Sequence, residues 1–142
     1  MTAFTNYFKS KLLEHSFGGV AFTKPTTLHI GLLNSVTSIP DGNVTEVSRT
    51  STGYLRVAMT CSLETISVPG NWFNNESGVL SNQASIQFPS ATGNWGTCSY
   101  VGIWDAATAG NLLVCVPLSP ARNITTGTSP QLASLALSIA LT

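Results

Sequence analysis

The stretch 96–116 reads GTCSYVGIWDAATAGNLLVCV, and it predicts two β-strands joined by a short loop. Residues Gly96–Trp104 and Leu112–Val116 are rich in β-branched, aromatic and other apolar residues, which favour strands. The connection Asp105–Asn111 contains mostly small residues and ends in a glycine and an asparagine, as hairpin connections often do. A hairpin of this kind indicates a mainly β fold.

Further strands are predicted on both sides of the hairpin. Short apolar runs bounded by Gly, Pro, Asn and Asp clusters favour strands at Leu28–Leu33, Tyr54–Cys61 and Ala84–Phe88. Pro117 and Pro120 are expected to end the second hairpin strand, because proline cannot donate a hydrogen bond to a sheet.

The C-terminal stretch Leu132–Leu141 has the composition of a helix and the pattern of a strand. From Leu135 to Leu141, large apolar residues alternate with serine and alanine. Four successive matches to a period of two outweigh the helical propensity of Leu and Ala. We therefore predict one long final strand.

An amphipathic helix is predicted over residues 1–17, because apolar residues recur at every fourth position. The recurring residues are Phe4, Phe8 and Leu12. Thr2 and Thr5 are the candidate caps, and Gly18-Gly19 supplies the geometry that commonly ends a helix. Its apolar face either packs on its own domain or docks on a neighbouring subunit, and the residues leave both readings open.

These elements predict a single domain over residues 1–142. The chain is long enough for one good core and too short for two. A short N-terminal helix (1–17) followed by six or seven strands (27–142) predicts a β-sandwich or a jelly-roll-like fold.

The chain is unusually poor in charge. Charged residues make up 8% of it, where about 25% is typical, and six basic residues balance six acidic ones. Such a surface favours association, because little repulsion keeps copies apart. We expect a homo-oligomer, with a trimer as the expected form. The alternative is a monomer with a neutral surface of Ser and Thr.

Several partners and cofactors are not expected. The basic residues are scattered, so the electrostatic footprint of nucleic-acid binding is missing. No run of 18 apolar residues predicts a membrane span, and residues 2–11 lack the apolar core of a signal peptide. Cys61, Cys98 and Cys115 are widely spaced and odd in number, which favours free, buried thiols.

No catalytic, metal or cofactor site is predicted. His15 and His29 stand apart and lack the spacing of metal ligands. No nucleophile motif is present, and nothing marks a pair of carboxylates for hydrolysis. The chain is therefore not expected to be an enzyme. Arg56, on a polar strand face, is expected to pair with a carboxylate such as Glu46.

Aromatic residues supply the candidate contact surfaces. Tyr100 and Trp104 share one strand face and are expected to be core or interface anchors. Trp72 lies in a loop rich in Pro, Gly and Asn and is the best candidate for an exposed contact. The predicted partner-binding residues, taken from the helix face and this loop, are Phe4, Phe8, Leu12, Trp72 and Phe73.

The chain resembles a family of short bacteriophage virion proteins that are usually labelled tail-fibre proteins. The resemblance covers nearly the whole chain. It is carried by Leu12–Gly19, Ala21–Pro25, Leu28–Leu32, Thr45–Ser48, Gly53–Arg56, Phe88-Pro89, Asn94–Thr97, Val101–Ala107 and Gly110–Leu113. It implies a structural part of the virion, assembled in the host bacterial cytoplasm, without catalysis.

Two roles follow from this resemblance. The first, which we favour at this point, is a capsid cement or decoration protein that binds between major capsid protein subunits and stabilises the head. The second is a tail-fibre or receptor-binding subunit that contacts host surface saccharide, with Trp72 and its neighbouring asparagines as the contact. A cell-wall hydrolase is disfavoured for lack of a site.

Overall fold

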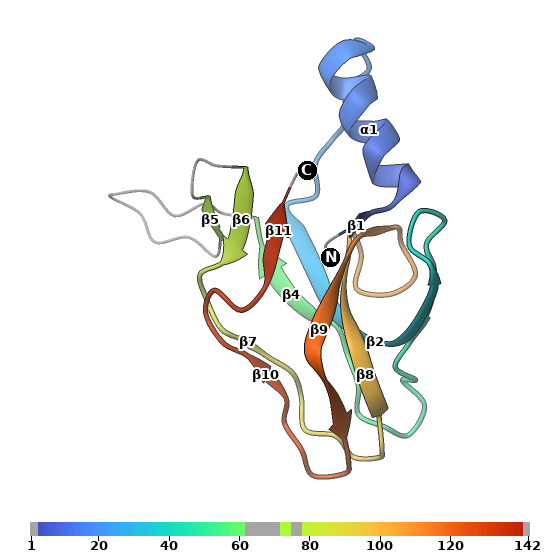
Figure 1. Ribbon diagram of the computed structural model, residues 1–142, viewed down its shortest axis with the longest axis vertical. Coiled ribbons are helices and arrows are strands. Elements are labelled where there is room, and N and C mark those ends of the chain that lie inside the picture. The colour runs from blue at the N-terminus through green and yellow to red at the C-terminus, as the bar shows by residue number, and fades with distance from the viewer. Residues whose placement is uncertain (1–2, 62–71, 75–77, 141–142) are drawn as a thin grey trace.

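The computed structural model describes residues 3–61, 72–74 and 78–140, with only the backbone of residues 73 and 74. Its described elements are one helix and eleven strands, so the mainly β class with an N-terminal helix is confirmed (Figure 1). In chain order they are β1 (Ala3–Phe4), α1 (Asn6–Phe17), β2 (Thr27–Ser38), β3 (Asn43–Glu46), β4 (Val57–Thr60), β5 (Trp72–Asn74), β6 (Val79–Asn82), β7 (Ile86–Gln87), β8 (Gly96–Trp104), β9 (Leu112–Ile124), β10 (Gln131–Leu132) and β11 (Ser138–Ala140).

A six-stranded antiparallel sheet forms the body of the molecule. Its order is β1, β9, β8, β2 and β3, and β4 also pairs with β2. The predicted hairpin of β8 and β9 lies at its centre, with Val101 opposite Val116 and Ile103 opposite Val114. β4 and β3 share the remaining edge of β2, because β4 pairs near its start and β3 near its end.

Two glycines in adjacent strands of this sheet make room for the side chain of Trp104. Gly31 of β2 and Gly102 of β8 lie opposite each other in register. A Cβ atom on Gly31 would lie 2.7 Å from the Trp104 ring, and one on Gly102 would lie 2.4 Å from it. The indole therefore packs directly on the backbone of both strands, which only glycine permits.

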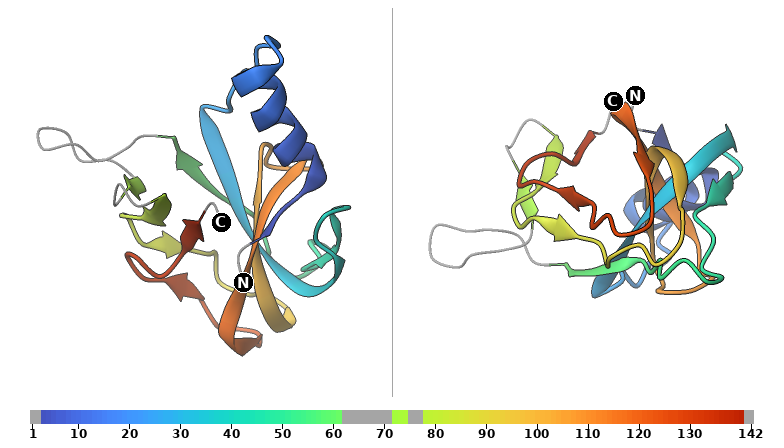
Figure 2. Two further views of the ribbon diagram at one scale, coloured as in Figure 1. Left: turned by 45° about the horizontal axis from the view of Figure 1, so that its top comes forward. Right: turned by 90° about the horizontal axis from the view of Figure 1, so that it is seen from below.

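The smaller sheets cover the opposite face of the large one. β5, β6 and β11 form one of them, and β7 and β10 form the other (Figure 2). Ile30 and Leu32 from the large sheet are buried in one cluster with Ile86, Phe88 and Leu137 from the covering segments. A second, smaller cluster on the other face contains Leu33, Trp104, Leu112 and Cys115.

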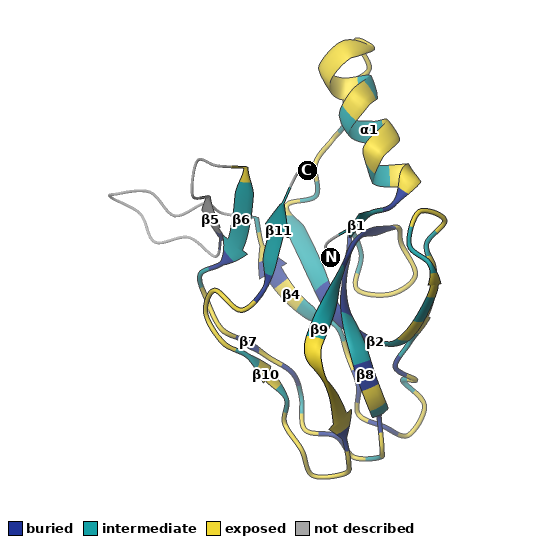
Figure 3. Cartoon of the chain, viewed as in Figure 1, coloured by how far each residue is buried: buried dark blue, intermediate teal, exposed yellow. Residues whose placement is uncertain are grey.

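The predicted helix is confirmed over Asn6–Phe17, but the prediction that it includes Phe4 is wrong, because Ala3 and Phe4 pair with β9 as strand β1. The helix itself packs weakly. Thr5 is its N-cap, because its hydroxyl accepts a hydrogen bond from the Phe8 amide at 3.4 Å. Gly18 follows the last residue, and Gly19 adopts a positive φ of 68°. No residue of α1 is buried, and Figure 3 shows the helix projecting beyond the body with most of its length exposed.

The strand β9 runs through both prolines, so the expectation that they end it is wrong. Pro117 lies opposite Tyr100, and the register then shifts before Arg122 pairs with Cys98. β1 pairs with β9 at Val114 and Cys115, short of the prolines. Proline is tolerated at such an irregular edge because its missing N–H leaves no gap in a regular ladder.

The prediction of a single long C-terminal strand is also wrong. The chain forms β10, turns through Ala133–Leu137, and then forms β11. Asn82, which is fully buried, causes the break: its side-chain amide donates to the carbonyls of Ala84 and Ala133, and its side-chain oxygen accepts from the Leu137 amide. Leu135 is turned outward and is 55% exposed.

Two other predicted strands are shorter than expected, and one is longer. The strand predicted over Tyr54–Cys61 is confined to β4, and the one predicted over Ala84–Phe88 is confined to β7. The strand predicted over Leu28–Leu33 extends at both ends to form β2. Within the described residues, no helix is long and apolar enough to cross a membrane.

Candidate functional site

The residues predicted to bind partners lie in three different settings. Phe4 and Phe8 are half-buried and pack against each other, with ring centres 5.7 Å apart. Leu12 is also half-buried and lies one helical turn further along. Trp72 is only 2% exposed, so the exposed tryptophan that we expected is not found. The side chain of Phe73 lies outside the described residues.

The most elaborate polar cluster surrounds Arg56, whose side chain is only 4% exposed. Its guanidinium forms two hydrogen bonds of 2.8 Å to the Glu46 carboxylate, as the sequence predicts. It also donates to the carbonyls of Ala106 and Ala109, at 2.8 and 2.9 Å. The cluster therefore ties β3 to the loop 105–111.

Tyr54 completes this cluster. Its hydroxyl donates to Glu46 at 2.9 Å and accepts from the Leu32 amide at 2.8 Å. Burial raises the pKa of Tyr54 well above its usual range. Burial alone would raise the pKa of Glu46, but the hydrogen bonds from Arg56 and Tyr54 outweigh it and hold that pKa below its usual value. Charges and donors are matched here, which is the arrangement of a structural clamp.

The two histidines lie in different settings. Within the described ranges, no three His, Cys, Asp or Glu side chains gather where they could hold a metal ion. His15 Nδ1 accepts a hydrogen bond from the Phe22 amide, and burial together with the charge of Arg56 lowers the pKa of His29. Burial also raises the pKa of the Cys98 and Cys115 thiols to about 11, so both are unreactive near neutral pH.

A polar hollow lies between the first turn of α1, the turn 39–42 and the loop 105–111; we call it the Tyr7 hollow. Its volume is about 410 Å³. Tyr7 is 37% exposed, and Asp41 is the one charged side chain on the lining. Asn6 and Asn111 add two amides, and Trp104 lies deeper in the wall.

Hydrogen bonds fix the walls of the Tyr7 hollow. The backbone N–H of Asn6 donates to the Pro40 carbonyl at 2.8 Å, and this hydrogen bond joins the start of α1 to the turn. Ser38 donates to one oxygen of Asp41 at 2.7 Å. The side chain of Asn111 donates to Asp105 at 2.8 Å, which leaves the Asn111 oxygen available as an acceptor.

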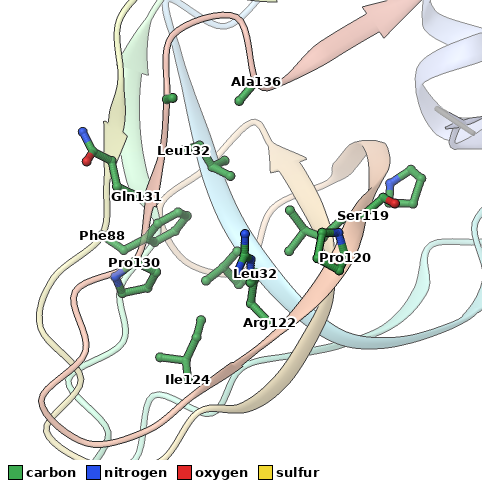
Figure 4. Close-up of a pocket in the computed structure, with 13 residues that line it drawn as sticks. Leu32, Phe88, Ser119, Pro120, Arg122, Ile124, Pro130, Gln131, Leu132 and Ala136 are labelled. Carbon is green, nitrogen blue, oxygen red and sulfur yellow. The ribbon is translucent and has the colours of Figure 1, made fainter.

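A second hollow of about 410 Å³, the Arg122 hollow, opens between the second half of β9 and the chain around β10. Figure 4 shows Pro120 and Arg122 on the β9 side, with Phe88 and Leu132 from the covering segments facing them. Phe88 is 2% exposed and thus offers little ring surface to a ligand. Arg122 is the one charged residue on this lining.

A third hollow, the apolar groove, lies between α1 and the strands β6 and β11. It is the largest of the three, at about 560 Å³. Phe8 and Leu12 form its helical side, and Leu80 and Ile139 contribute from the smaller sheet. Cys61 also reaches its lining. Such a lining offers contact surface but little hydrogen bonding.

Comparison with known families identifies the chain. Its residues 3–140 match the family described as "Podophage GP4 fiber I protein gp80". The chain belongs to this fibre family. It is therefore a phage tail-fibre protein, a non-enzymatic structural part of the virion. No curated protein matches it.

This membership corrects the role that the sequence favoured. The resemblance to virion proteins labelled as tail-fibre proteins stands, but the capsid cement role is not supported. The family supports the second hypothesis, a tail-fibre protein.

Sequence reasoning missed the residues of the Tyr7 hollow in this fibre protein. It predicted a loop at Asp105–Asn111 and a helix that includes Tyr7. Nothing local indicates that the three segments around the hollow meet, because they are joined by the long-range pairing of β1 with β9. The available signal was a helical tyrosine that falls outside the spacing of Phe4, Phe8 and Leu12.

Proposed function

We propose that this tail-fibre protein contacts a neutral saccharide on the host surface through the Tyr7 hollow. The observation that carries the proposal is an exposed aromatic ring flanked by one carboxylate and two amides. A volume of about 410 Å³ falls within the range of small-ligand sites. Trp72, the contact expected from sequence, is buried and supplies no such surface.

The chemistry of the hollow suits a sugar. The apolar C–H face of a pyranose packs on an aromatic ring such as that of Tyr7. Sugar hydroxyls donate to the Asp41 carboxylate, and a charge-assisted hydrogen bond of this kind is stronger than a neutral one. Asn6 and Asn111 provide both donors and acceptors. Because Asp41 is the one charge on the lining, an acidic sugar would be repelled.

The hollow is also preorganised. Hydrogen bonds hold the side chains of Asp41 and Asn111 and the backbone of Asn6, so binding orders few further groups. A site of this size with few polar contacts binds weakly by itself. Many copies on one virion, facing a repetitive surface polymer, raise the overall affinity without any new contact.

The test is an equilibrium titration with the neutral polysaccharide fraction released from the host cell surface. We expect Tyr7→Ala to weaken binding at least about tenfold, which corresponds to about 1.4 kcal/mol. Asp41→Asn, which keeps the shape and removes the charge, is expected to weaken it severalfold. Arg122→Ala is the matched control, since it alters the other polar hollow and should leave the affinity unchanged.

The same titration can refute the proposal. If Tyr7→Ala and Asp41→Asn bind as the unaltered protein does, the Tyr7 hollow is not the site. If Arg122→Ala alone loses binding, the contact lies in the Arg122 hollow and not in the Tyr7 hollow.

A further inference from the structure

The helix α1 is only partly packed against its own chain. It has 12 residues and none of them is buried. A helix of this length is marginal in water unless an apolar face is packed against something. The ring contacts among Phe4, Phe8 and Phe22 hold one side of it, with centres 5.7 and 6.3 Å apart.

The opposite side of α1 is apolar as well. Leu13 is 60% exposed and Phe17 is 86% exposed, and they share a face because they are four residues apart. Val20, just beyond the helix, is 53% exposed. Among the described residues, four of the six exposed large apolar side chains lie between positions 7 and 20. A helix that is apolar on two sides is normally covered on both.

The apolar groove lies on the other side of α1 from this projecting face. Phe8 and Leu12 of the same helix line it, and its other walls come from β2, β6, β9 and β11. One chain therefore carries a projecting apolar face, formed by Leu13, Phe17 and Val20, and an apolar hollow of about 560 Å³. We infer that a second copy of this chain docks there, with its Leu13–Phe17 face in the apolar groove.

Charge and area both favour a second copy as the occupant. The chain has six basic and six acidic residues, so net repulsion between copies is absent. A 12-residue helix is about 18 Å long and about 10 Å across, so half of its lateral surface is roughly 300 Å². A chain that contributes both a helix and a groove therefore buries roughly 600 Å², without counting the side chains that flank the helix. This area is near the ~800 Å² that each partner buries in a standard interface.

Closed symmetry lets every copy contribute both features. In a dimer, the helix of each chain can dock in the groove of the other. In a cyclic trimer, the helix of each chain can dock in the groove of the next chain. In either case the same residues meet, namely the Leu13–Phe17 face of one copy and the groove of the next. The homotrimer expected from the sequence is one of these arrangements.

The first test is the mass of the full-length protein in solution, measured by sedimentation over a range of concentrations. We expect a dimer or trimer whose dissociation constant rises at least tenfold in Leu13→Asp and in Phe17→Asp. Leu55→Asp is the matched control, because Leu55 is 58% exposed and does not line the groove. It should change the dissociation constant less than twofold.

A monomeric unaltered protein would overturn the inference. An oligomer that tolerates both helix substitutions, or that Leu55→Asp disrupts equally, would also overturn it. Because all of these residues lie outside the Tyr7 hollow, saccharide binding is measured independently, and each proposal can fail alone.

The second test uses a native thiol. Cys61 lines the apolar groove, whereas Cys98 and Cys115 are fully buried. We expect Phe17→Cys to form a disulfide with Cys61 of a second copy under mild oxidation, giving a covalent oligomer that reductant reverses. Adding Cys61→Ser should abolish this product, and Leu55→Cys should not form it. A covalent oligomer that persists without Cys61 contradicts the proposed contact.

Discussion

The guanidinium carbon of Arg56 lies 3.9 Å from the centre of the Trp104 ring. The same indole also packs on the backbone at Gly31 and Gly102, so both a cation and the sheet backbone hold the ring in place. The same guanidinium binds the loop carbonyls of Ala106 and Ala109. Since this loop carries Asn111, the Arg56 cluster supports one wall of the Tyr7 hollow.

Removing the Arg56 charge should destabilise the protein. Arg56→Met leaves Glu46 largely buried beside the weaker, longer contact with Arg49, and losing one partner of a buried pair costs about 3 kcal/mol or more. The free energy of unfolding from urea denaturation measures this loss. Arg49→Met, at a more exposed position, should cost about 1 kcal/mol or less. Equal losses in the two variants would contradict the role of Arg56 as the clamp.

Stability should fall in acid because of Glu46. Its pKa is lower in the folded state than the usual value, so its contribution is present above about pH 4.5 and is lost as the pH falls through the folded pKa. We expect the free energy of unfolding to decline as the pH falls below about 4.5. Glu46→Gln should flatten this decline, whereas Glu14→Gln, in an exposed pair with Lys11, should not. An unchanged slope in Glu46→Gln would show that other carboxylates cause the decline.

A methyl group beneath the tryptophan should not be tolerated. In Gly102→Ala the added Cβ would lie 2.4 Å from the Trp104 ring, so the indole must leave its place. We expect a loss of about 1–3 kcal/mol, typical of overpacking. Trp104→Leu removes the obstacle, so the double variant should be more stable than the sum of the single losses predicts. Additive losses would mean that the ring and the glycine do not constrain each other.

The C-terminal turn should depend on Asn82. Asn82→Ala leaves the Ala133 carbonyl and the Leu137 amide without their partner, and each unsatisfied buried group costs about 1–3 kcal/mol. Asn82→Asp keeps the acceptor for Leu137 but replaces the donors with an oxygen that faces two carbonyls in a buried site, so it should be at least as destabilising as Asn82→Ala. Hydrogen exchange of the Leu137 amide reports the change directly. Unaltered protection of this amide in Asn82→Ala would contradict the proposed cause of the turn.

Local sequence determines some of these elements and not others. The β8–β9 hairpin and the helix were predictable, because turn residues, apolar spacing and the Thr5 cap act over a few positions. The C-terminal break was not, since Asn82 acts on residues about fifty positions away. Alternation alone favoured a straight strand there.

The candidate site was less predictable than the fold. Its side chains come from the helix start and from two turns that meet only after β1 has paired with β9. The burial of Trp72 was also invisible in the sequence, because a tryptophan between Pro, Gly and Asn residues has the composition of an exposed loop. The pairing of Arg56 with Glu46 was correctly expected, since a strand arginine in a chain so poor in charge needs a carboxylate.

The most direct test of the account is the adsorption rate of phage whose fibres carry Tyr7→Ala. Virions with the native number of fibre copies are compared with unaltered phage and with phage that carries Arg122→Ala. If the Tyr7 hollow contacts host saccharide, the adsorption rate constant of Tyr7→Ala phage should fall several-fold, while Arg122→Ala phage adsorbs normally. Normal adsorption by Tyr7→Ala phage would contradict the proposed host contact.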